Sequence, residues 1–191
     1  NNISKEYDIS NAIKINIPNS LEERASNSDV QKVMDEFKDK YDENKGVKIE
    51  RSQIVFQPKG TNKINANKIL DDTKIFIKYS KNNTNEKLPN WNEKIISDFN
   101  KSIEKSIKDE LIYFYNKTFP NIELDWLTTE NGKANNNVFT KISCLVNTGN
   151  DITEISSYLF FNTNENVMIT YSRNKNNKAK WDRIFLETLE T

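Results

Sequence analysis

The end of the sequence changes from strand-like to helix-like spacing, and this change constrains the fold more than any other feature. Residues 138–146, 152–161 and 167–171 are rich in apolar side chains, largely at alternate positions, with turn residues between the stretches. Such alternation is typical of strands that bury one face. Around Trp181 the apolar residues recur every three or four positions, which predicts an amphipathic helix. The ending therefore predicts an antiparallel meander with a helix packed on it.

Earlier segments add further strands and a first helix. Residues 12–17 alternate strictly between apolar and polar side chains, which predicts a half-buried strand. A capping box that begins at Ser28 predicts the start of a helix. Residues 47–57 predict one interrupted strand or two short strands, with a bulge or bend at residues 51–52. Residues 74–79 predict another strand.

The middle of the chain predicts a long helix over residues 91–116, whose apolar stripe includes Ile107. A strand over residues 122–126 and a tight turn at Asn131 and Gly132 follow. The predicted order is β-α-β-β-α-β-β-β-β-α, which places the chain in the α+β class with a mainly antiparallel sheet. Helices cover both faces in an α/β/α sandwich, or only one face in an open sheet.

The chain has 191 residues, which suits a single domain over residues 1–191. Residues 1–10 are expected to be a polar N-terminal lead-in before the first strand. The sequence does not begin with Met and starts with polar residues. We therefore expect an exported bacterial protein whose signal or lipid-anchor segment has been removed. The expected location is therefore the cell envelope or the extracellular space, with the cytoplasm as the alternative.

The C-terminal segment SSYLFFNTNENVMITYSRNKNNKAKWDRIFLETLET resembles the end of Mog1/PsbP-like domains, which finish with two strands, a polar loop and a helix with an early Trp. The early segment IKINIPNSLEE is compatible with the same family. The resemblance covers about the last third of the chain and a short piece near its start. It implies a six- or seven-stranded antiparallel sheet between helices, and a binding or assembly role more readily than catalysis.

Composition removes several kinds of chemistry. The chain has no histidine, one cysteine and four glycines. Ser-His-Asp and Cys-His nucleophilic sites and histidine zinc sites are therefore excluded, and neither GxGxxG nor GxxxxGKS occurs. The 28 basic and 28 acidic residues balance, so no global field attracts nucleic acid. We expect no cofactor, no metal, no nucleic-acid partner and no transmembrane segment.

The remaining reactive side chains are expected to have structural roles. Cys144 alternates with apolar neighbours in a predicted strand, which favours a buried thiol. Asp71 and Asp72 precede a strand and favour a turn, although two facing carboxylates could hydrolyse a glycosidic bond. Further carboxylates crowd the first helix, where a solvated face is favoured over a calcium site. Basic residues near the last helix favour a solvated loop; they are Arg173, Lys175, Lys178, Lys180 and Arg183.

Tyr113, Tyr115 and Phe119 form a dense aromatic group at the end of the long helix. These side chains cannot all face one core, so one or two should be exposed and could mark a partner surface. The sequence thus favours a non-enzymatic binding or accessory module, as an exported envelope protein or lipoprotein, that uses this group or a sheet edge. The alternative is a carboxylate-dependent hydrolase acting on envelope carbohydrate. Partner identity and oligomeric state do not follow from the sequence.

Overall fold

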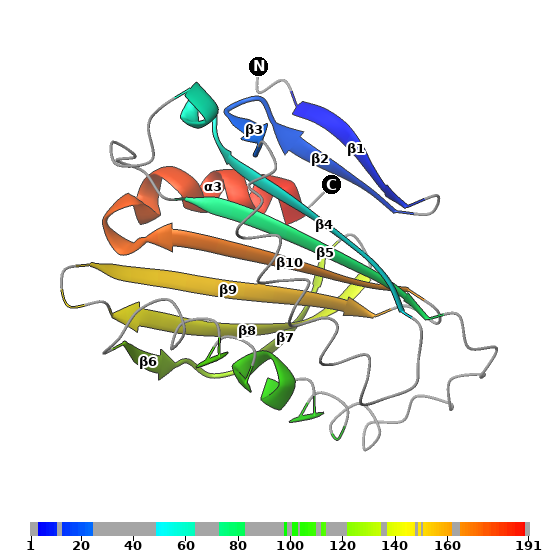
Figure 1. The fold of residues 1–191 in the computed structure, drawn as a ribbon. Helices are drawn as coiled ribbons and strands as arrows, with labels where there is room; N and C mark the ends of the chain where they lie inside the picture. The colour runs from blue at the N-terminus through cyan, green and yellow to red at the C-terminus, as the bar shows by residue number, and fades with distance from the viewer. Residues whose placement is uncertain are drawn as a thin grey trace.

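Long antiparallel strands dominate the computed structural model of the chain (Figure 1). It describes residues 4–10, 13–24, 49–63, 73–82, 98, 101–102, 104–109, 112–113, 122–134, 137–147, 149, 151–161 and 165–189. The strands are β1 (Ser4–Ser10), β2 (Ile13–Pro18), β3 (Leu21–Glu23), β4 (Ile49–Pro58), β5 (Lys74–Asn82), β6 (Glu123–Trp126), β7 (Glu130–Ala134), β8 (Asn137–Asn147), β9 (Ile152–Phe161) and β10 (Glu165–Asn174). The labelled helical elements are the short turns η1 (Thr61–Lys63) and η3 (Lys175–Asn177) and the helix α3 (Lys178–Leu189).

Eight of these strands form one sheet in the order β3-β4-β5-β10-β9-β8-β6, in which β7 also pairs with β8. Every pairing in the sheet is antiparallel. The meander predicted from the end of the sequence is confirmed as β8, β9 and β10, and the mainly antiparallel α+β fold is confirmed with it. The sheet has eight strands where six or seven were expected, because β3 and β7 carry no clear strand pattern.

One face of the sheet, which we call the α3 face, is covered by the C-terminal helix. Trp181 and Phe185 of α3 are almost fully buried, and they belong to one cluster with Tyr171 on β10. Ile75 and Phe56, on β5 and β4, extend that cluster across the sheet. The apolar stripe predicted around Trp181 is therefore confirmed, and it packs on the sheet as its spacing predicts.

The opposite face is covered by a second helix. The described helical residues 98, 101–102, 104–109 and 112–113 are called the Ile107 helix here. Ile107 is buried with Ile142 on β8 and Leu159 on β9. Tyr158, the neighbour of Leu159, packs against the α3 cluster instead. Since neighbouring strand residues point to opposite faces, helices cover both faces of the sheet, as the α/β/α arrangement predicts.

The polar N-terminal lead-in contains a strand that the sequence does not reveal. Residues Ser4–Ser10 form β1, which pairs with β2 in a separate two-stranded ribbon. Ile9 of β1 and Ile15 and Ile17 of β2 are buried in the same cluster as Trp181 and Phe185 of α3. The strand is hidden in the sequence because its outward positions are charged. Lys14 of β2 forms an ion pair of 2.7 Å with Glu6 across the ribbon.

Two local predictions are wrong. Asn131 and Gly132 lie inside β7, where Gly132 pairs with Phe139, and do not form a turn. Glycine fits there because an added Cβ would lie 2.5 Å from the Cζ atom of the Phe139 ring. The expected bulge at residues 51–52 does not occur, since the β4–β5 register runs without a shift from Ile49 to Phe56.

Other expectations fall outside the described residues. These are the helix that begins at Ser28, the start of the long helix at Trp91, and the segment over residues 64–72. Within the part of the chain that the structure describes, no helix has the length and apolar character needed to span a membrane.

Candidate functional site

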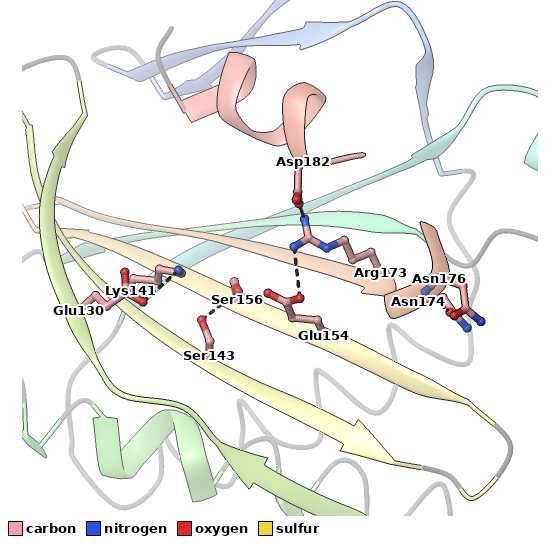
Figure 2. Close-up of polar contacts among 9 residues, drawn as sticks. All are labelled: Glu130, Lys141, Ser143, Glu154, Ser156, Arg173, Asn174, Asn176 and Asp182. Carbon is pink, nitrogen blue, oxygen red and sulfur yellow. Dashed lines mark hydrogen bonds and ion pairs between the residues drawn. The ribbon is translucent and has the colours of Figure 1, made fainter. Parts of the chain in front are cut away.

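A buried arginine clamps α3 to the sheet. Arg173 ends the buried row of β10 and is 9% exposed. Its Nη2 atom lies 3.3 Å from Oε2 of Glu154 on β9, and its Nη1 atom pairs with Oδ1 of Asp182 on α3 (Figure 2). The guanidinium thus joins two strands to one helix, and we call these three residues the Arg173 clamp. An arginine fork suits two carboxylates at different angles better than a lysine would.

An aromatic ring and an asparagine side chain make further contacts around the Arg173 clamp. The Arg173 guanidinium carbon lies 5.5 Å from the centre of the Phe185 ring, and its Nε atom is buried without a hydrogen-bond partner among the described residues. At the turn into α3, the Asn174 amide donates to Oδ1 of Asp151 (3.0 Å), and its side-chain oxygen accepts from the Asn176 backbone N–H (2.9 Å). The ion pairs and hydrogen bonds around Arg173 thus fix the position of α3 on the sheet.

A second polar group lies farther across the α3 face. Nζ of Lys141 on β8 is 3.3 Å from Oε1 of Glu130 on β7 and 5.9 Å from the centre of the Tyr158 ring. Burial raises the pKa of Tyr158, and the nearby Glu130 carboxylate raises it further, while Arg173 lowers it. The Tyr158 hydroxyl therefore stays protonated and neutral at neutral pH.

Buried hydroxyls lie between these two groups (Figure 2). The Ser143 and Ser156 hydroxyl oxygens are 2.9 Å apart, in neighbouring strands. Ser157 and Thr170 form a similar pair of 2.8 Å on the opposite face. A serine nucleophile needs an adjacent base, and pairing with another hydroxyl does not supply one. Both pairs hold strands together by cross-strand hydrogen bonding.

Cys144 is fully buried, as its strand position predicts. Burial raises the pKa of its thiol from 9.0 to about 12. A thiol held protonated at neutral pH is a poor nucleophile. Burial in an apolar cluster with Val146 and Ile155 gives Cys144 a packing role.

The Cys144 thiol should make the protein sensitive to alkali. Because its folded pKa is raised, the unfolded chain loses the proton first, and the free energy of unfolding falls as pH rises above 9. Between pH 9 and pH 12 this loss should reach about 4 kcal/mol. Urea titrations from pH 8 to pH 12 measure it, and Cys144→Ala should flatten the decline. An equally steep decline in the variant would contradict this role of the thiol.

The structure describes only some of the residues singled out in the sequence. Tyr113 is 41% exposed on the Ile107 helix. Tyr115, Phe119, Asp71, Asp72 and the acidic residues of the first helix lie outside the described residues. Of the basic residues near α3, Arg173 is buried in the clamp, whereas Lys175, Lys180 and Arg183 are exposed. Among the described residues, no group of three metal-ligating side chains is placed to hold an ion.

The Ile107 helix is fixed against β6 next to its exposed end. Nζ of Lys108 lies 5.0 Å from the centre of the Trp126 ring and 2.6 Å from Oε1 of Glu104. A hydrogen bond from Lys108 lowers the pKa of Glu104, and Thr129 contributes a weaker one. One turn beyond Lys108, Ile112 is 38% exposed beside Tyr113. Leu127, which follows Trp126, is 41% exposed.

The alternation of β10 contains a sequence signal for the Arg173 clamp. Arg173 has the same alternation phase as Val167, Ile169 and Tyr171, which are buried on the α3 face. A charged residue in a buried phase predicts a buried, paired charge. Glu154 likewise shares the phase of Ser156 and Tyr158. No sequence signal identifies Asp182 as the third member, because that choice depends on how α3 lies on the sheet.

No family model and no curated protein sequence matches the chain. Among solved structures, the chain is similar to the solution structure of cyanobacterial PsbP (CyanoP) from Synechocystis sp. PCC 6803, with a TM-score of 0.51 and 10% identity over 97% of this chain and 88% of that one. It is also similar to the Pseudomonas aeruginosa protein of unknown function PA94, with a TM-score of 0.40 and 7% identity over 98% and 94% of the two chains. The fold is therefore PsbP-like, as the C-terminal segment predicts.

Proposed function

We propose that this chain is a non-enzymatic binding or accessory module. One observation carries the proposal: apolar side chains are exposed together at the end of the Ile107 helix. Ile112 and Tyr113 are each about two-fifths exposed on this helix, which Lys108 joins to β6 through the Trp126 ring. Neighbouring apolar side chains that are exposed on a packed helix suit a protein partner. Likeness in fold does not carry a role, so the proposal rests on this surface.

The proposed partner surface extends from Tyr113 to Tyr115 and Phe119. Capture of a purified partner on the immobilised chain should be saturable, and Tyr113→Ala, Tyr115→Ala or Phe119→Ala should weaken it at least tenfold, as expected for aromatic hot spots. Leu186→Ala is the matched control, because Leu186 is an exposed apolar residue on α3. Equal capture by all variants would reject this surface, and absence of saturable capture of any protein would contradict a binding role.

We place the protein in the cell envelope or outside a bacterial cell, as an exported protein or a lipoprotein. Fractionation of cells that express the full-length gene, together with mass spectrometry of the mature N-terminus, tests this location. Recovery of the protein in the cytosol alone would contradict export and favour the cytoplasmic alternative.

A further inference from the structure

Among the strands that the structure describes, β6 lies at the margin of the sheet and has an open backbone edge. Among the described residues, β6 pairs with β8 on one side only. The Leu127 N–H continues this pairing by donating to the Ser143 carbonyl (2.9 Å). Antiparallel pairing alternates, so residues 123, 125 and 127 direct their backbone groups toward β8. Leu124 and Trp126 therefore direct their N–H and C=O groups away from β8. Figure 1 shows β6 at the margin of the sheet.

The two faces of this edge differ in chemistry. Glu123 and Asp125 are exposed on one face, and Leu124 and Trp126 are half-buried on the other. The apolar face continues onto the Ile107 helix, where Ile112 and Tyr113 are exposed. An extended segment laid along β6 would thus meet carboxylates with one set of alternate side chains and apolar groups with the other.

We propose that the β6 edge binds an extended segment of a partner protein in which basic and apolar residues alternate, and that this segment adds a strand to the sheet. The inference rests on the proposed binding function and specifies the partner's chemistry. Backbone hydrogen bonds to Leu124 and Trp126 provide the attachment. Lysine or arginine side chains lie beside Glu123 and Asp125, and the apolar side chains lie beside Leu124, Trp126 and Tyr113.

A second copy of the chain fits this edge poorly. Antiparallel pairing of β6 with β6 of another molecule would bring the carboxylates of both strands onto one face. Like charges in cross-strand positions destabilise a pair. Acidic side chains on a strand edge also deter indiscriminate pairing. A basic partner strand converts the same charges into attraction, so the edge selects by charge as well as by shape.

Three capped synthetic octapeptides test the edge on the intact chain: alternating lysine and valine, alternating glutamate and valine, and four lysines followed by four valines. We expect only the alternating lysine–valine peptide to bind, with an affinity that falls as salt rises. Hydrogen exchange should slow at the Leu124 and Trp126 amides on binding. Binding that leaves these two amides unprotected, absence of binding at millimolar peptide, or equal binding of the grouped peptide would overturn the inference.

Charge reversal identifies the acidic face. Asp125→Lys should weaken the lysine–valine peptide roughly fivefold and favour the glutamate–valine peptide. Asp8→Lys is the matched control, because Asp8 is an exposed acid on β1, in the separate ribbon. It should leave the affinity unchanged. Equal weakening by both variants would show a net-charge effect and contradict a local edge site.

Two variants distinguish a wrong β6 edge inference from a wrong proposed binding function. If Tyr113→Ala abolishes capture of the protein partner but Asp125→Lys does not, the binding role stands and the β6 edge inference falls. If neither variant changes saturable capture, the partner surface and the edge both fall. Loss of capture by both variants, with protection of the Leu124 and Trp126 amides, supports both.

Discussion

Replacing Trp181 with alanine is expected to lower the free energy of unfolding by about 4 kcal/mol. Trp181 is 1% exposed, and its ring stacks with Phe185 at a centroid distance of 6.5 Å. Truncation removes its apolar area from the core and leaves a cavity between α3 and the sheet. Helix α3 has only 12 residues, too few to be stable without this packing. Urea unfolding followed by far-ultraviolet circular dichroism measures the change.

The control for this variant lies on the same helix. Leu186 follows Phe185 but is 56% exposed, so Leu186→Ala should change the free energy of unfolding by less than about 0.5 kcal/mol. The comparison separates loss of core packing from the effect of placing alanine in the helix, which by itself raises helix propensity. Similar losses for Trp181→Ala and Leu186→Ala would show that α3 is not held by its buried stripe.

Replacing Arg173 with methionine is expected to lower the free energy of unfolding by about 3 kcal/mol. Methionine keeps the length and the apolar stem but removes the guanidinium. The Glu154 side chain is only 14% exposed, so its carboxylate would remain desolvated without the cation that compensates it. Asp182 is 40% exposed, and water can replace its contact more readily. The larger part of the loss therefore comes from Glu154.

Two further variants test this cause. The double replacement Arg173→Met with Glu154→Leu should recover most of the lost stability, because a buried pair replaced on both sides leaves no uncompensated charge. Lys14→Met breaks the exposed ion pair with Glu6 on the β1–β2 ribbon and should leave the urea midpoint unchanged. If the double variant is no more stable than Arg173→Met, the clamp stabilises through something other than charge compensation.

Alternation in the sequence predicts which face of the sheet a residue occupies, but not which strands are neighbours. Ile169 and Tyr171 follow the strand pattern of β10 and are buried on the α3 face, as their phase predicts. The pairing of β10 with β5, which puts Val167 beside Tyr79, joins residues far apart in the chain. Such pairing depends on packing between distant segments, which no local pattern encodes.

The wrong turn prediction at Asn131 and Gly132 and the unrecognised strand β1 have related causes. Asn131 and Gly132 carry a strong turn signal, but the glycine serves the close approach of the Phe139 ring across the β7–β8 pair. Strand β1 is polar on its outer face, so Ile9 alone gives little indication of burial. In both cases a tertiary neighbour decides the conformation, and local propensity is overridden.

Some features of the candidate site could be predicted from the sequence, and others depend on the fold. The sequence predicts that one or two of Tyr113, Tyr115 and Phe119 are exposed, because they cannot all face one core. Tyr113 is 41% exposed, and the other two lie outside the described residues. The open groups of Leu124 and Trp126 depend on the β6–β8 register, which only the fold provides. The Arg173 clamp required both kinds of information, the phase of Arg173 from the sequence and the position of Asp182 from the packing of α3.

Nuclear Overhauser contacts from two adjacent residues of β9 test most directly whether helices cover opposite faces of the sheet. We expect the Tyr158 ring to show contacts to the cluster of Tyr171, whose ring centre is 5.5 Å away, and Phe185 of α3. The Leu159 methyl groups should show contacts to the cluster of Ile107 and Ile142. Contacts from both residues to the same helix would contradict the two-faced sheet, and the β6 edge beside the Ile107 helix would be lost with it.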